Sequence, residues 1–222
     1  MARAAAADGN ALRTQRTVER VLGEALRLFN ERGEAHVTTG MIAGSLDMSP
    51  GNLYYHFRNK DQIVERLFRR FEERFDIDPA PSANAAQAIE DLWFYLHFVL
   101  EAIWEFRFLY RNLDDLLARN RKLRLPFNRI IDRKLRVLEA LCDGLVRAGA
   151  MKASPEEIRA LARNVWIVAT YWLNFQSLRG RGETLSAEDV GQGAYQVLSL
   201  ISPYLVGEER RHLERLGRRY IE

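Results

Sequence analysis

The sequence has little of what a secreted or membrane-spanning protein needs. Its 222 residues include one cysteine, Cys142, so no intrachain disulfide can form, and a reducing, cytoplasmic location is expected. The most apolar run, residues 92–100, ends at Glu101, far short of the roughly 20 residues that a membrane span requires. Residues 1–11 are too short and too soon interrupted by charge for a secretory signal. We therefore expect a cytoplasmic protein with no membrane partner.

Strand patterns and the common enzyme motifs are also missing. The chain has no Gly-rich phosphate loop, no zinc-type cysteine pair and no Ser nucleophile elbow. Its four histidines are scattered, and only residues 209–212 have the Glu-x-x-His spacing of carboxylate-bridged metal bundles, which need two such motifs. That spacing lies in a charged segment that is more simply a solvated helix. The sequence predicts an all-α protein that is not an enzyme and binds no cofactor or metal, with an all-helical enzyme as the alternative.

Residues 37–60 have the pattern of two short helices joined by a tight turn. Ser49 can cap the second helix, with Pro50 at its first position, where a missing N–H costs nothing. Leu53 and Phe57 lie four apart and can bury one side of this helix. The opposite side then offers Asn52, Tyr55 and His56. A short helix with a buried stripe and an exposed polar, aromatic tip fits the major groove of DNA in a helix-turn-helix.

The same segment resembles the TetR family of bacterial transcriptional regulators. The matching residues are Thr38, Thr39, Ile42, Ala43, Ser49, the run from Gly51 to Phe57, and Lys60. The sequence departs from the family at Asp47, where a turn glycine is usual, and at Gly40, where some members carry a long side chain that touches a base. Asp tolerates the left-handed conformation better than most residues. The resemblance implies a DNA-binding head followed by a helical effector-binding and dimerisation body.

From this motif we predict the contacts with double-stranded operator DNA. Tyr55 and Lys60 are expected at phosphates. Ser49, Asn52 and His56 are expected near base edges, and Pro50 against a thymine methyl. The complete expected set is Thr39, Ser49, Pro50, Gly51, Asn52, Tyr54, Tyr55, His56 and Lys60. The net charge of +3 neither supports nor opposes this interpretation, because a repressor can be locally basic and balanced overall.

Helical periodicity and helix breakers divide the chain into three parts. Residues 1–13 are small and polar, and we expect a flexible arm there, either a disordered tail or a basic arm that touches DNA. The proline-containing segment 78–82 breaks the helical pattern and marks the domain boundary. The expected DNA-binding domain is 14–77, and the expected effector-binding and dimerisation domain is 83–222. We expect about nine to ten helices in all.

Several helix boundaries in the second domain can be assigned from the sequence. Residues 108–117 are expected to form one short helix, and Pro126 is expected to open a long one. Ser154 and Ser186 have the pattern of helix caps. Gly180 and Gly182 mark a loop.

The helix expected over residues 89–104 is apolar on nearly all sides and is the place to look for an effector pocket. Aromatic residues at helical spacing are more often plain core, and a histidine among them can be satisfied by a neighbour. The candidates are Trp93, His97, Trp104, Phe108 and Tyr110, with Tyr171 and Asn174 as weaker ones. Residues 107–113 and 202–209 loosely resemble TetR-type regulators of polyhydroxyalkanoate metabolism, which implies a small hydrophobic, fatty-acid-derived effector.

The last two long helices resemble the pair with which TetR-type proteins form a homodimer. A solitary chain could bury the same apolar side chains internally. The expected interface residues are Trp166, Trp172, Val197, Leu198 and Ile201. Two-fold symmetry would place two recognition helices about 34–36 Å apart or farther. The predicted function is a repressor that an effector releases from a palindromic operator, and the alternative is an interaction module with a degenerate DNA-binding head.

Overall fold

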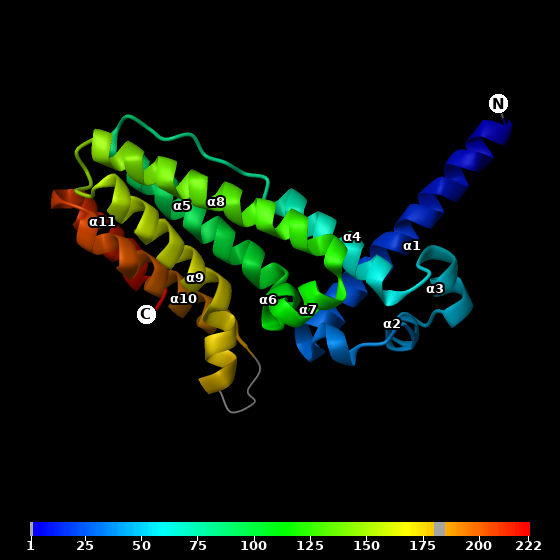
Figure 1. Ribbon diagram of the computed structural model, residues 1–222. Helices are drawn as coiled ribbons and strands as arrows, with labels where there is room; N and C mark the ends of the chain where they lie inside the picture. The colour runs from blue at the N-terminus through cyan, green and yellow to red at the C-terminus, as the bar shows by residue number, and fades with distance from the viewer. Residues whose placement is uncertain (1, 180–184) are drawn as a thin grey trace. The chain divides into compact units, whose positions relative to one another are not determined.

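The computed structural model describes residues 2–179 and 185–222, with side chains from residue 12 onward, and this part of the chain is all helical (Figure 1). It contains eleven α-helices, two short 3-10 helices and no strand, so the all-α expectation is confirmed. A single antiparallel bridge joins Met151 to Leu205. The loop expected at Gly180 and Gly182 lies outside the described residues. None of the described helices combines the length and the apolar character that crossing a membrane requires.

The first of two compact units ends at Phe71 and holds three helices and most of a fourth. Its elements are α1 (Ala2–Arg32), a 3-10 helix (Glu34–His36), α2 (Thr39–Ser45), α3 (Pro50–His56) and α4 (Lys60–Arg74). Apolar residues spaced three and four apart on each helix point inward and form one core. Its buried side chains include Val21, Leu22, Phe29, Ile42, Leu53, Phe57, Ile63, Leu67 and Phe68.

Two boundaries of this unit differ from those predicted. The first helix begins at Ala2 rather than near Thr14, so residues expected to form an arm are helical. Four consecutive alanines at 4–7 favour this continuation, since alanine has the highest helix propensity. The two units divide within α4, between Phe71 and Glu72, so the last turn of α4 belongs to the second unit, whereas the boundary was expected at 78–82. There Arg74 pairs with Glu105 and its guanidinium lies over the ring of Phe98.

The second unit is a helical bundle. Its elements are α5 (Ala85–Glu105), α6 (Arg107–Arg111), α7 (Leu113–Arg119), α8 (Arg121–Arg147), α9 (Pro155–Arg179), α10 (Ala187–Ile201), a 3-10 helix (Ser202–Tyr204) and α11 (Gly207–Arg218). Figure 1 shows α5, α8, α9 and α10 running side by side, and α11 lies against α5 and α10. Their apolar faces meet in the centre, so α5 is buried over most of its length, as expected for a helix that is apolar on nearly all sides.

Two helices in this bundle were predicted with wrong bounds. The single helix expected at 108–117 is divided at Asn112, whose extended φ of −141° ends α6 before α7 begins. The long helix α8 begins at Arg121, so Pro126 lies inside it rather than at its start. Proline there leaves one backbone carbonyl without its helical partner. Burial of Leu123 and Phe127, one turn apart, offsets that cost. The apolar stripe of α8 therefore begins before Pro126 and continues after it.

Candidate nucleic-acid interface and ligand site

Side-chain caps fix the starts of α2 and α3. The Thr38 hydroxyl accepts from the N–H of Met41 at 3.2 Å, and the Ser49 hydroxyl accepts from the N–H of Asn52 at 3.2 Å. Between the two helices, Asp47 has a φ of 51°, the left-handed conformation expected where it replaces a turn glycine. The turn and the caps together hold α3 in a defined direction from α2.

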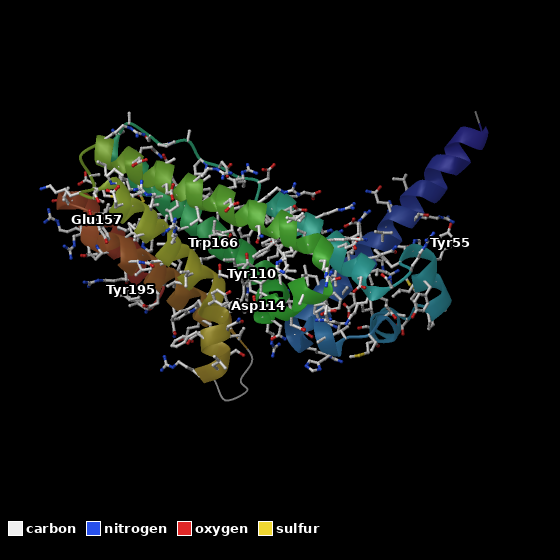
Figure 2. The ribbon with its side chains drawn as sticks, in the orientation of Figure 1. Tyr55, Tyr110, Asp114, Glu157, Trp166 and Tyr195 are labelled. Atoms are coloured by element: carbon white, nitrogen blue, oxygen red, sulfur yellow. The ribbon has the colours of Figure 1, made fainter. Side chains whose placement is uncertain are left out.

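The helix α3 has one buried side and one exposed side, as predicted. Leu53 and Phe57 are buried in the core of the first unit. On the other side Tyr55 is 80% exposed, and Figure 2 shows it projecting from α3. The His56 ring packs edge-on against the Tyr55 ring, with centroids 5.1 Å apart. The remaining exposed residues at the tip of this helix are Ser49, Pro50, Gly51 and Asn52.

Tyr54 and Thr39 have a structural role in this region. The Tyr54 and Thr39 hydroxyls lie 3.0 Å apart and share a hydrogen bond that joins α3 to α2. Tyr54 is half exposed, less than Tyr55, as its contact with α2 requires. Both hydroxyls can still accept or donate a further bond at the surface.

Lys60, expected at a phosphate, has a protein partner in this structure. Its Nζ lies 2.8 Å from Oε1 of Glu34 and donates to the Glu34 backbone carbonyl at 2.8 Å. Glu34 is buried, so this ion pair fixes the start of α4 against the 3-10 helix. A phosphate contact at Lys60 must therefore share the ammonium with Glu34 or displace it. The sequence did not reveal Glu34 because 26 residues separate the partners.

Further basic residues of the first unit lie on its surface. Arg13, Arg16 and Arg20 are exposed on α1 at spacings of three and four, and Arg58 is exposed just after α3. Of these, only Arg13 falls within residues 1–13, where a basic arm was one of the two expectations. These guanidinium groups can contribute positive charge to a phosphate-binding surface.

In the second unit, His97 is satisfied by neighbouring side chains. Its Nδ1 lies 2.7 Å from the Tyr220 hydroxyl, and its Nε2 lies 3.2 Å from a carboxylate oxygen of Glu101. The Trp93 ring stacks on the imidazole at 5.5 Å with an interplanar angle of 11°. These contacts agree with the interpretation in which His97 is satisfied by neighbouring side chains rather than by a ligand.

The other expected effector residues are spread over several places. The Arg107 guanidinium lies 4.0 Å from the centroid of Trp104, while Phe108 is core. Tyr110 is buried edge-on against Phe127, and burial raises the pKa of its hydroxyl well above the ordinary value. Tyr171 and Asn174 lie on α9, exposed and half-buried respectively. None of these seven residues lines the two cavities described below.

A small cavity lies elsewhere in the bundle, between α5, α8, α9 and α10. Its volume is about 10 Å³, which is room for about one water molecule. Its wall is almost entirely apolar. Tyr95, Lys134 and Trp166 are the lining residues that carry a polar group, and Trp166 lies midway along α9 (Figure 2). The apolar lining residues are Leu96, Val99, Leu100, Leu138, Val165, Ala169 and Val197.

Lys134 is the functional candidate that the sequence reading missed. It is only 2% exposed, and its Nζ donates to the Ile77 carbonyl at 2.9 Å and pairs with Asp78 at 3.3 Å. The ammonium also lies 5.4 Å from the centroid of the Tyr95 ring. Burial lowers the pKa of Lys134, and the Asp78 carboxylate opposes that shift. The available signal was a lone lysine within the buried stripe of α8 formed by Phe127, Ile130, Leu138 and Leu141.

The linker between α4 and α5 is fastened along α8. Arg133 pairs with both Asp76 and Asp78, next to the Lys134 contact. Farther on, a Cβ added at Gly144 would lie 2.8 Å from the Pro81 Cβ, so the linker passes close to the helix there. Figure 1 shows this segment following α8.

The expected dimer residues do not form an exposed surface. Val197, Leu198 and Ile201 are at most 4% exposed and belong to the core of the chain's own bundle, so their assignment to a dimer surface is corrected. Trp172 donates from Nε1 to the Asp189 carbonyl at 2.6 Å and packs tightly on Gly193. These side chains were misassigned because an apolar face on α10 has the same sequence pattern whichever partner covers it.

An apolar row on α9 is exposed instead. Ile167, Tyr171, Phe175 and Leu178 follow one another at spacings of four, four and three, so they share one face of the helix. Each of them is at least 45% exposed, and Leu178 is 86% exposed. A contiguous exposed apolar face of this kind is typical of a protein–protein contact.

No group of three or more His, Cys, Asp or Glu side chains that could hold a metal occurs in the described part of the chain. An open surface hollow of about 730 Å³ lies between the start of α5 and α11. Its lining mixes apolar, polar and charged residues, and Glu90 pairs with His212 there.

Comparison with known proteins gives matches along most of the chain. Residues 58–213 match a family profile described as TetR, bacterial transcriptional repressor. Residues 21–67 match a second profile, bacterial regulatory proteins of the tetR family. The crystal structure of a TetR-family transcriptional regulator from Marinobacter aquaeolei VT8 is 36% identical, with a TM-score of 0.78 over 92% of this chain and 98% of that one.

Other relatives are more distant or match over a shorter segment. The transcriptional regulator QacR of Staphylococcus aureus is 35% identical over 57 residues, 26% of this chain and 30% of that protein. UidR of Escherichia coli K12 is 33% identical over 60 residues, 27% of this chain and 31% of that protein. The match thus spans under a third of these curated relatives. A regulator from Saccharomonospora viridis in complex with choline shares the fold, with 21% identity and a TM-score of 0.65 over 87% of this chain and 99% of that one.

Proposed function

This chain belongs to the TetR family of bacterial transcriptional regulators, and we propose that it is a repressor released from a palindromic DNA operator by a small hydrophobic effector. The matched families and relatives are transcriptional regulators rather than enzymes. The observation that carries the proposal is α3, a capped helix with one buried side and an exposed polar, aromatic side.

The proposed DNA contacts follow from that exposed side. A helix of this kind can enter the major groove with its first residues at base edges. Asn52 is the best base reader of the set, because an amide can donate and accept at one adenine. The Tyr55 hydroxyl is free to reach a phosphate, and Lys60 can do so if it shares its charge with Glu34.

The proposed homodimer uses the exposed row on α9. Association would remove Ile167, Tyr171, Phe175 and Leu178 from water, which is the main driving force for such contacts. In a two-fold dimer each copy presents one α3, and operator half-sites one or more helical turns apart would match the two helices.

The proposed effector binds in the body and is hydrophobic, with a fatty-acid-derived metabolite as the candidate. The cavity wall is mostly aliphatic, which suits such a molecule. The choline of the Saccharomonospora viridis complex is a cation, and in this chain a cation in the cavity would meet the like charge of buried Lys134. A ligand can release DNA only if it binds the DNA-free conformation more tightly than the DNA-bound one.

A gel shift with the DNA upstream of the chain's own gene tests this function. We expect a retarded complex that survives an excess of random competitor DNA and that weakens steeply as salt rises. A ligand-free protein that binds upstream and random DNA equally, or neither, would instead support the interaction module with a degenerate head.

A further inference from the structure

Lys134 takes part in two neighbouring features of the second unit. Its side chain lines the small cavity between α5, α8, α9 and α10. Its ammonium also holds the linker, through the Ile77 carbonyl and the Asp78 carboxylate. A molecule in the cavity that interacts with this ammonium would therefore act on the linker as well.

The charge of Lys134 is poorly balanced where it lies. An ammonium has three donors, and two are used by Ile77 and Asp78. The Asp78 carboxylate is shared, because Arg133 binds its other oxygen. The ammonium also lies near two aromatic rings, 5.4 Å from the centroid of Tyr95, which lines the cavity, and 5.6 Å from the centroid of Phe75. The third N–H of the Lys134 ammonium is thus available to donate a charge-assisted hydrogen bond to an anion bound in the cavity.

Two buried polar groups on α9 have no hydrogen-bond partner within the described part of the chain. Trp166 lines the cavity, and its indole N–H is buried with no hydrogen-bond acceptor within the described part of the chain. One turn along α9, the Thr170 hydroxyl is also buried and has no partner there. Buried donors are normally satisfied, so unpaired ones beside a cavity suggest that a ligand or water supplies the acceptor.

We propose that the effector is an anionic amphiphile, an apolar chain ending in a carboxylate, and that Lys134 binds this carboxylate in competition with Asp78. The proposal rests on the proposed function in one respect, since it names the chemical class of that effector. The aliphatic wall accommodates the chain, and Trp166 can donate to the carboxylate or to a carbonyl near it.

Binding would require the cavity to widen, because about 10 Å³ holds no molecule larger than water. The ligand therefore selects a conformation in which α9 and α8 stand farther apart around Trp166 and Leu138. In that conformation the ammonium turns from Asp78 toward the ligand and weakens one of the contacts that fasten the linker to α8.

Three probes with the same alkyl chain test the anion preference on the 222-residue protein. Decanoate, 1-decanol and protonated decylamine share one chain and differ in charge. We measure their dissociation constants by calorimetry and their thermal shifts, and follow Trp166 by fluorescence against a Trp166→Phe control. Decanoate is expected to bind about tenfold or more tightly than decanol, since a charge-assisted hydrogen bond is gained, and decylamine is expected to bind most weakly.

Variants assign the preference to Lys134. Lys134→Met is expected to lose about tenfold or more in decanoate affinity and to keep its decanol affinity. Arg133→Met removes a neighbouring cation that pairs with the same linker but does not line the cavity, and it should retain the decanoate preference. Asp78→Asn removes the competing carboxylate and should bind decanoate more tightly than the parent. It also keeps Lys134, so the test survives if Lys134→Met fails to fold.

Two results would overturn the proposal. One is a decanoate preference that is equal in the parent and in Lys134→Met, and the other is a parent that binds none of the three probes. The ligand-free gel shift is scored separately. DNA binding without probe binding contradicts only this inference, whereas Lys134-dependent probe binding without operator binding contradicts only the proposed repressor function.

Discussion

Asn52 is the side chain of α3 on which we expect operator recognition to depend most. Asn52→Ala should lower affinity for the operator by about 1–3 kcal/mol and leave affinity for random DNA unchanged, because a bidentate base contact is lost. Gel shifts on both DNAs measure the difference, with Tyr55→Phe as the comparison, since a phosphate contact acts equally on both. An equal loss on operator and random DNA would show that Asn52 does not read a base.

Lys60 combines a proposed role at DNA with a structural one. Lys60→Met should flatten the slope of log affinity against log salt by about one unit, as expected for one lost phosphate contact. It should also lower the free energy of unfolding by about 1–3 kcal/mol, because buried Glu34 loses its cationic partner. Glu34→Gln in the same chain should restore part of that stability, measured by urea unfolding. An unchanged salt slope would leave Lys60 with the structural role alone.

Local residue patterns were predictable and long-range pairs were not. The caps at Thr38 and Ser49 and the left-handed Asp47 depend on neighbours within four residues, so the sequence specifies them directly. Lys60 meets Glu34, and Lys134 meets Asp78, only after helices distant in sequence have packed together. No local spacing indicates which carboxylate a lysine will find.

At the scale of elements, the linker from α4 to α5 is the segment whose contacts we expect to be most sensitive to small changes. Gly144→Ala places a Cβ 2.8 Å from Pro81, so the linker or the helix must shift. Gly23→Ala is the matched control, because nothing lies within 4 Å of its Cβ and it too is helical. We expect Gly23→Ala to stabilise by about 0.5–1 kcal/mol, from helix propensity, and Gly144→Ala to lose that gain or destabilise.

Thermal and urea unfolding of the two variants measure this difference. If Gly144→Ala stabilises as much as Gly23→Ala, the close approach of Pro81 is not maintained in solution. The comparison keeps the chemical change constant, so the difference between the variants reports on the linker contact.

Most helices could be predicted from apolar periodicity, but their ends followed burial rather than local signals. The start signals at Ser154 and Ser186 are confirmed as capping boxes, with Glu157 and Asp189 completing them. Pro126 was read as a helix start, yet the apolar stripe continues before it and extends α8 to Arg121. A tertiary contact thus outweighed a local preference that is otherwise reliable.

At the scale of the whole molecule, the same apolar pattern serves two purposes on α9 and α10. Val197 and Ile201 face the chain's own core, whereas Tyr171 and Phe175 remain exposed. The sequence contains both sets with the same helical spacing, so it could predict that apolar surface was present but not which part a second copy would cover. The structure separates the two sets because it shows what the single chain buries by itself.

Phe175→Glu tests whether the α9 row joins two copies. Phe175 is 47% exposed, and a carboxylate there would have to be desolvated in a dimer contact, so we expect a monomer by light scattering. The control is Phe94→Glu, the same change at a 56% exposed position on α5, which should remain dimeric. Since a repressor dimer holds two half-sites at once, the monomer should lose most of its operator affinity but still bind nonspecifically. A Phe175→Glu protein that stays dimeric and binds the operator like the parent would place the interface elsewhere.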